Sequence, residues 1–281
     1  MKCTVMPSRA ASPPPALRRR VILLGASNVT RGLAKVIDAS RLQLGGPLDV
    51  LAAIGHGRSY GRPSRVLGRR LTGILDCGLW DELARREPLP SVGLITDVGN
   101  DILLGVPLPT IQNWLELTFQ RMRQACESLI VTELPLETIR QLSPRRFVVF
   151  RSLLFPKSRL QYGEAIELAH AVNQQLIELA TRCQAALVRP KAEWYAIDPI
   201  HVRQRSAFVA WMSILGHWKP PSHEHRADAL DDLLRQIAFA NWRSKWSLRF
   251  ALPLERQWFG WKQTCAQPAR VLHDGTWVSL Y

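Results

Sequence analysis

Val21-Ile22-Leu23-Leu24-Gly25-Ala26-Ser27-Asn28 is the stretch of sequence that decides the fold. Four aliphatic residues follow Arg20 and end at a glycine, a pattern typical of a buried strand in a parallel sheet. The next residues lead into a helix-like segment, so Ser27 stands at the carboxyl end of the strand, where open α/β sheets bind ligands. Serine at that position also commonly caps the following helix. This stretch alone therefore leaves two interpretations open, a helix cap and a functional hydroxyl.

Length and composition indicate an ordinary globular protein. A chain of 281 residues with 47% apolar and 21% charged residues suits one α/β domain of about 200 residues and an extension. The five cysteines follow no metal or redox spacing, which favours reduced thiols. Residues 1–19 are rich in proline and arginine but lack the apolar core of a signal peptide, and no apolar run is long enough to span a membrane. We expect a flexible N-terminal arm and a cytoplasmic location.

The net charge of +14 is large for a chain of this size. A basic surface attracts nucleic acid, anionic lipid or an acidic substrate. The arginines are nevertheless spread along the whole chain, and no zinc finger, basic heptad region or aromatic RNA-binding signature is present. We therefore predict no nucleic-acid partner, and a general richness in arginine explains the charge better.

Strand-like and helix-like segments alternate after the first strand. Further short apolar runs typical of strands lie at 48–54, 91–98, 129–132 and 185–188. Apolar residues at helical spacing lie at 30–40, 66–75, 110–125, 165–183 and 206–215. This alternation predicts right-handed crossovers and a three-layer α/β/α sandwich with a central parallel sheet, of the flavodoxin-like kind. We assign residues 20–216 to this domain.

Five polar or glycine residues at predicted strand ends and in a late loop fit the parts of an acyl-transfer site. The hydroxyl of Ser27 needs a base to become a nucleophile, and His201 is the candidate. A carboxylate must hold the tautomer of that histidine, and Asp198 lies three residues before it. The oxyanion needs hydrogen-bond donors, which the side chain of Asn100 and the backbone of Gly57 can supply. Each residue also has a structural interpretation as a turn former or a buried polar group, but their order along the chain favours a common site.

These residues resemble the four sequence blocks of the SGNH hydrolases, also called the GDSL esterase/lipase superfamily. The four blocks are Gly25-Ala26-Ser27-Asn28, Gly57-Arg58-Ser59, Gly99-Asn100-Asp101 and Asp198-Pro199-Ile200-His201. In the first block, Ala26 and Asn28 depart from Gly-Asp-Ser-Leu, whereas the third and fourth blocks match the family without change. Together the blocks extend over about residues 21–215.

The resemblance implies a serine esterase that hydrolyses carboxylic esters. Ser27 would be the nucleophile, His201 the base and Asp198 its orienting carboxylate. The oxyanion hole would be formed by Ser27, Gly57 and Asn100, with Gly55 as the alternative glycine. The resemblance implies no cofactor and no metal, and a small-molecule, carbohydrate or lipid ester as the substrate. Two alternatives remain: an acyltransferase on the same residues, and a non-catalytic binding protein suggested by the altered first block.

Two side chains of the second block have alternative roles. Arg58 is expected either to bind an anionic group of the substrate or to lie on the surface. His56 lies inside the second block and is therefore a second candidate base beside His201. We interpret it as a solvated loop residue, because it stands between glycines.

Residues 217–281 form a basic, tryptophan-rich extension that the family resemblance does not explain. His217, His223 and His225 lack clean metal-ligand spacing, so we predict no metal site. A helix is predicted over 227–241, and a hairpin over 271–278 with Asp-Gly in a type I′ turn. Five aromatic residues between 242 and 262 are expected to be buried against the domain, because so much apolar surface is costly to leave in water. Packing on the domain is favoured over covering the active-site crevice and over peripheral contact with an anionic membrane surface.

Overall fold

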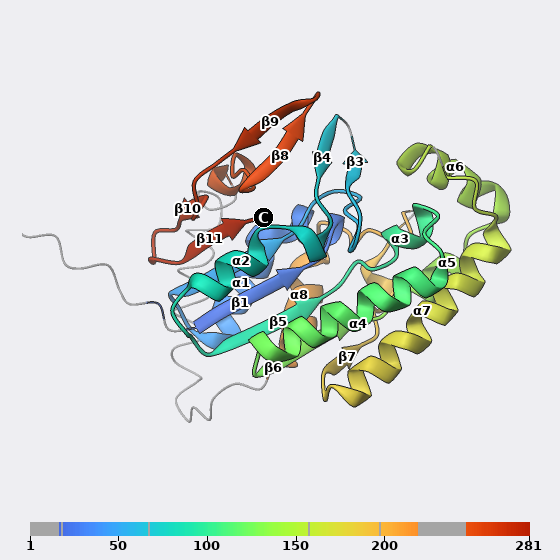
Figure 1. Ribbon diagram of the computed structural model, residues 1–281. Helices are drawn as coiled ribbons and strands as arrows, with labels where there is room; N and C mark the ends of the chain where they lie inside the picture. Colours follow the sequence, from blue (N-terminus) through green and yellow to red (C-terminus); the bar gives the residue numbers. More distant parts are fainter. Residues whose placement is uncertain (1–16, 18, 67, 157, 197, 219–245) are drawn as a thin grey trace, which may run out of the picture.

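The computed structural model describes residues 17, 19–66, 68–156, 158–196, 198–218 and 246–281 (Figure 1). Within these residues, a seven-stranded sheet has the order β10-β11-β2-β1-β5-β6-β7. All neighbouring strands are parallel except β10 and β11. The strands are β1 (Arg19–Leu24), β2 (Leu48–Ala53), β5 (Ser91–Ile95), β6 (Ser128–Thr132), β7 (Ala186–Val188), β10 (Arg270–Val271) and β11 (Trp277–Leu280). The predicted parallel α/β sheet is confirmed.

Helices cover both faces of the sheet, so the predicted three layers are confirmed. Along β1, Val21 and Leu23 face one apolar core, which α1 and α8 complete. Ile22 and Leu24 face the other core, which α2, α4 and α7 complete. The helices are α1 (Ser27–Leu44), α2 (Leu79–Arg85), α4 (Leu108–Ala125), α7 (Tyr162–Arg182) and α8 (Ala207–Leu215). Strict alternation of fully buried side chains along one strand requires an apolar layer on each side of it.

The order of the strands fixes where a site can form. The chain passes from β1 to β2 on one side and then returns to β5 on the other side of β1. This reversal opens a crevice at the carboxyl ends of β1 and β5, the usual ligand site of such sheets. Ser27 follows β1 and Asn100 follows β5, so the two residues meet at this crevice.

The helix predicted over 66–75 is wrong. The chain there forms β3 (Ser64–Val66), β4 (Arg69–Leu71) and a short 3₁₀ turn (Ile74–Asp76). Gly68 turns the chain between the two strands with a φ of +77°, a value that favours glycine. β4 also pairs with β8 (Glu255–Trp258), and β8 pairs with β9 (Trp261–Thr264), which gives a separate antiparallel sheet in the order β3-β4-β8-β9.

Helices also lie where none was predicted. They are α2, α3 (Asn100–Leu103), α5 (Leu136–Arg140) and α6 (Pro144–Leu154). In Figure 1, α5 and α6 lie beyond the carboxyl ends of the strands, next to the start of α7. Among the residues that the structure describes, no helix is both long and apolar enough to cross a bilayer.

The end of the chain lies inside the main sheet. β11 is parallel to β2, and the N–H of Tyr281 donates to the main-chain oxygen of Ala52 at 3.0 Å. Val278 is fully buried, and Leu280 and Tyr281 are 7% and 2% exposed. The antiparallel pair of β10 and β11 agrees with the predicted hairpin, but its turn is different.

The predicted type I′ turn is wrong because the strands are joined by the five residues 272–276. Gly275 has a positive φ of +86°, whereas Asp274 does not. The Asp274 carboxylate accepts hydrogen bonds from the N–H and the hydroxyl of Thr276 at 3.2 and 2.8 Å. These two bonds hold the aspartate in an ordinary conformation, which a type I′ turn excludes.

The expected burial of aromatic rings in the extension is wrong for three of them. Trp246, Phe259 and Trp261 are 57%, 70% and 79% exposed. Strand pairing, rather than ring burial, therefore attaches this part of the extension to the domain. Trp242 and the helix predicted over 227–241 lie outside the described residues.

Candidate active site

Ser27 is the first residue of α1 and follows the sharp turn at the end of β1. Its side chain is 8% exposed, and its Oγ lies 2.8 Å from Nε2 of His201. Ala26 occupies the cap position, and its own side chain makes no capping hydrogen bond. The turn requires Gly25, because a Cβ at that position would lie 2.8 Å from the side chains of Thr96 and Val29. The helix-cap interpretation of Ser27 is wrong, since its hydroxyl points at the histidine instead.

His201 and Asp198 complete a chain of hydrogen bonds that ends on the serine. Nδ1 of His201 lies 2.6 Å from Oδ2 of Asp198, and the other carboxylate oxygen accepts the N–H groups of Ile200 and His201 at 3.2 Å each. A carboxylate at Nδ1 holds the proton on that nitrogen, which leaves Nε2 free to accept from the serine hydroxyl. Burial alone would raise the pKa of Asp198, but the hydrogen bond and charge of His201 outweigh it, so this pKa lies below its ordinary value.

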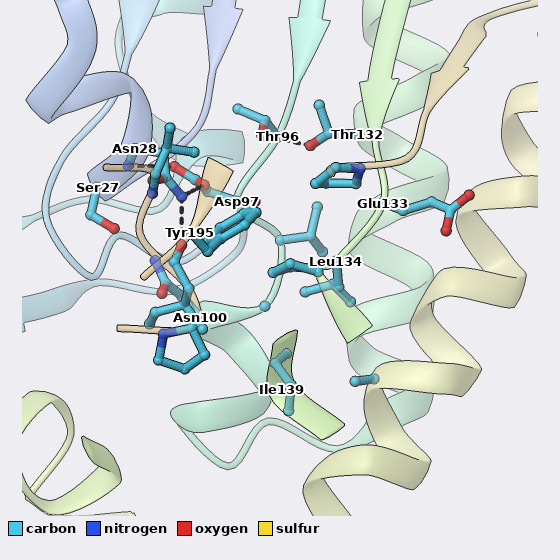
Figure 2. Close-up of a pocket in the computed structure, with 18 of the residues that line it drawn as sticks. Ser27, Asn28, Thr96, Asp97, Asn100, Thr132, Glu133, Leu134, Ile139 and Tyr195 are labelled. Carbon is cyan, nitrogen blue, oxygen red and sulfur yellow. Dashed lines mark hydrogen bonds between the residues drawn. The ribbon is translucent and has the colours of Figure 1, made fainter. Parts of the chain in front are cut away.

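Asn28 and Asp97 connect the serine turn to the histidine loop (Figure 2). The side-chain amide of Asn28 donates to Oδ1 of Asp97 at 2.7 Å and to the main-chain oxygen of Ile200 at 2.9 Å. Its oxygen accepts the N–H of Val202 at 2.9 Å. One asparagine side chain thus binds the residues on both sides of His201.

Asp97 also binds the main chain of the serine turn. Its Oδ2 accepts the N–H groups of Ala26 and Asn28, both at 2.9 Å, on either side of Ser27. Its backbone has a φ of +60°, which is uncommon for a residue with a side chain. Asp97 was not predicted as a site residue, although its position two residues after the end of β5 was the available signal.

Two residues that line the crevice have N–H groups with donor capacity left. The N–H of Ser27 belongs to the first turn of α1, and no acceptor among the described residues binds it. Asn100 is 8% exposed, and its amide donates one hydrogen bond, at 3.1 Å, to the main-chain oxygen of Arg58. The amide has a second N–H, and both residues line the same pocket.

Gly57 lies in the loop that Asn100 contacts through Arg58. It has a φ of +61°, and a Cβ there would lie 2.6 Å from Val66. The positive φ of Gly57 favours glycine, whereas a Cβ on Gly55 would lie 2.3 Å from Cδ1 of Leu71 and would require this side chain to move. The role of Gly57 as a third donor, with Gly55 as the alternative, remains a proposal.

Arg58 has neither of its two predicted roles. It is fully buried and donates to the main-chain oxygens of Ile54 and Thr72 at 3.1 Å each, and also to that of Tyr281. A guanidinium used in this way cannot reach the substrate or the surface. Its function is to join the second block to the end of the chain.

A mostly apolar pocket of about 120 Å³ opens beside Ser27 and Asn100. Its walls come from the strand ends and from α5, α6, α7 and α8. Apolar side chains that line it include Leu134, Ile139, Leu142, Phe147 and Trp211. Such a lining suits an apolar group of a ligand.

No group of three potential metal-ligating side chains occurs among the residues that the structure describes. His217 belongs to these residues and is exposed. His223 and His225 lie outside them.

No protein-family model matches the sequence, and no curated protein sequence matches it either. Several solved structures are similar. A carbohydrate acetylesterase family member from Sinorhizobium meliloti is 14% identical, with a TM-score of 0.49 over 70% of this chain and 95% of that chain. An aryl esterase of M. smegmatis is 15% identical, with a TM-score of 0.46 over 70% and 96%. AlinE4, described as an SGNH-hydrolase family esterase, is 13% identical, with a TM-score of 0.38 over 82% and 98%.

Proposed function

We propose that this protein is a serine esterase that hydrolyses carboxylic esters. The observation that carries the proposal is the chain of contacts from Asp198 through His201 to Ser27, with distances of 2.6 and 2.8 Å. These separations lie within the range that a nucleophile and its base require. The position of Asn100 on the same pocket supports the assignment of an oxyanion donor.

The reaction follows from the protons that each group can hold. His201 takes the proton of Ser27 as Oγ attacks the ester carbon, and Asp198 stabilises the resulting imidazolium. The N–H groups of Ser27 and Gly57 and the amide of Asn100 bind the oxyanion. The C–O bond to the alcohol then breaks, and the alcohol leaves with the proton from His201. Water then attacks the acyl carbon while His201 takes its proton, and the acid is released as Ser27 regains a proton from His201.

The apolar pocket would receive the acyl group. It adjoins the serine and holds few polar groups, so an acyl chain gains free energy by leaving water there. We therefore expect esters of short unbranched acids that are longer than acetate, such as butyrate, to be better substrates than acetate esters.

The proposal is tested with p-nitrophenyl butyrate and with a fluorophosphonate probe. Ser27→Ala and His201→Ala should each lower kcat by several orders of magnitude, and the double variant should lose little more, because the two groups act as a unit. The probe should label the wild-type protein and spare Ser27→Ala. Equal labelling of both proteins would contradict a serine nucleophile.

The acyltransferase alternative uses the same acyl-serine intermediate. Adding glycerol to the assay separates the two activities, because a transferase would form the glycerol ester while a hydrolase would release the acid. A binding protein without catalysis would fail both the turnover and the labelling tests.

A further inference from the structure

A second cavity, which we call the basic groove, lies next to the candidate active site. It has a volume of about 900 Å³ and contains the cations Arg31, Lys35, Arg69, Arg249 and Arg256. These residues come from α1, from β4 and from the C-terminal extension, which lies beside β3 and β4 in Figure 1. Among the described residues that line the groove, none is an aspartate or a glutamate.

The groove has no lining residue in common with the apolar pocket, but two of its residues lie close in sequence to Ser27 and His201. Arg31 follows Ser27 by four residues on α1, and residues at this spacing share a helix face with Cβ atoms about 5–6 Å apart. Gln204, three residues after His201, also lines the groove. A group bound beside Arg31 would therefore lie within a few bonds of an ester carbon at the serine.

Four of the five cations of the groove have no carboxylate partner within the part of the chain that the structure describes. Within the described residues, Arg31, Arg69, Arg249 and Arg256 form no ion pair with a carboxylate. The guanidiniums of Arg69 and Arg256 both contact the ring of Trp258, at 5.3 and 5.5 Å from its centroid. Two cations that share one ring repel each other, and an anion bound between them would offset this repulsion.

The pKa values of two groove residues agree with this surplus of positive charge. Partial burial and then the charges of Arg69, His201 and Arg31 lower the pKa of His56. Burial and the charge of Arg69 lower the pKa of Arg256. His56 thus lies close enough to both His201 and the groove cations for their charges to affect its pKa. The groove and the candidate active site are therefore near neighbours.

We propose that the basic groove binds a phosphate group on the alcohol side of the ester. Guanidinium groups match phosphate oxygens with paired hydrogen bonds, and several arginines meet in this one cavity. The apolar pocket would hold the acyl group and the groove the phosphorylated alcohol, which leaves with the proton from His201. This inference depends on the proposed esterase function and adds the chemical class of the alcohol.

Three butyrate esters of one three-carbon alcohol skeleton test the proposal. They are 1-butyrylglycerol, its 3-phosphate, and the carboxylate analogue in which glycerate replaces glycerol. We expect kcat/KM to be about tenfold or more higher for the phosphate than for the neutral ester. The carboxylate should fall between them. Equal kcat/KM for the phosphate and the neutral ester would overturn the proposal, and equal values for phosphate and carboxylate would overturn the choice of phosphate.

Substitutions show whether the preference arises in the groove. Arg31→Gln, and the same change combined with Arg69→Gln, should lower the phosphate-to-neutral ratio of kcat/KM by about tenfold or more. Arg31 is exposed, so Arg31→Gln should fold like the wild type. The single variant therefore tests the groove even if the double variant does not fold. The control removes two exposed helical arginines elsewhere, Arg85→Gln and Arg123→Gln, and should leave the ratio unchanged. A ratio that falls equally in the control would show that net charge is responsible, and would overturn the assignment to the groove.

The outcome is separable from that of the esterase proposal. Fluorophosphonate labelling of Ser27 and hydrolysis of the neutral ester report on the esterase alone. A labelled, active enzyme without a phosphate preference would reject the groove and retain the esterase.

Discussion

At the scale of single residues, Asn28 explains why the first sequence block departs from the family pattern. A leucine at this position could not bind Asp97, Ile200 and Val202, which the asparagine side chain does at 2.7–2.9 Å. The serine turn and the histidine loop are 174 residues apart in sequence, and these bonds fix their relative position. Asn28 is therefore a positioning residue for His201.

Removing the Asn28 amide should disturb the serine–histidine distance. We expect Asn28→Ala to lower kcat by about 10²-fold with little change in KM, because a displacement of about 1 Å costs this much in a preorganised site. The rate of fluorophosphonate labelling should fall in parallel, which a loss of stability alone would not cause. Asn113→Ala, at an exposed position of α4, is the matched control. An Asn28→Ala protein with full kcat and a lower melting temperature would show that the residue only stabilises the fold.

Asp101 predicts a dependence of stability on pH. Burial raises its pKa to about 6, from 3.8 in the unfolded chain. Between these two values the folded protein holds a proton that the unfolded chain has lost, so the free energy of unfolding falls as the pH rises. One pKa unit corresponds to about 1.4 kcal/mol, and the total loss should be roughly 3 kcal/mol.

Asp101→Asn should remove this pH dependence. The amide oxygen can still accept the N–H of Tyr60, which the carboxylate now accepts at 3.0 Å. In urea titrations, the stability of the variant relative to wild type should increase by roughly 3 kcal/mol between pH 4 and pH 7. Asp76→Asn, at an exposed position, should show no such change. The same difference at both pH values would mean that Asp101 titrates normally in the folded protein.

The residues of the candidate site could be predicted because each follows a recognisable local pattern. Ser27 and Asn100 follow buried strands, and Asp198 and His201 keep a fixed spacing within one loop. The role of Arg58 could not be predicted, because its acceptors include Tyr281, 223 residues away. Burial and distant partners decide what an arginine does, and neither is visible in its local sequence.

At the scale of elements, the strands and helices with strong periodicity were predicted and the segments with distant partners were not. The helices predicted over 110–125 and 165–183 match α4 and α7 to within a few residues. The segment 66–75 has apolar residues at helical spacing, yet β4 pairs with β8 from the end of the chain. Pairing with a distant strand overrides a weak helical preference.

β11 is the element by which the extension stabilises the main sheet. It covers the edge of β2, which would otherwise present unpaired main-chain groups to solvent. Leu280→Ala should lower the free energy of unfolding by about 2–5 kcal/mol, because this side chain is 7% exposed and its loss leaves a cavity. Val271→Ala on β10, where the side chain is 58% exposed, should change it by about 0.5 kcal/mol or less. Equal effects of the two substitutions in urea denaturation would contradict an integral role for β11.

At the scale of the whole molecule, the 37 lysines and arginines outnumber the 23 aspartates and glutamates. Some of this charge is paired inside the protein, as where the buried carboxylate of Asp49 binds both Arg20 and Arg86. Salt screens such buried pairs only weakly, whereas it screens repulsion between exposed charges at distances beyond about 10 Å in 0.1 M salt. The folded chain brings its surplus cations closer together than the unfolded chain does, so this repulsion destabilises the fold.

Salt should therefore stabilise this protein. We expect the melting temperature to rise by roughly 2–4 °C between 10 and 150 mM sodium chloride at pH 7, which corresponds to about 1 kcal/mol for a domain of this size. Phosphate at equal ionic strength should raise it further, because phosphate would also bind in the basic groove and ligand binding to the folded state adds stability. Arg31→Gln should reduce only this extra increment, and Arg123→Gln should leave it intact. A melting temperature that falls with sodium chloride would mean that exposed ion pairs, rather than repulsion, dominate the electrostatics of the fold.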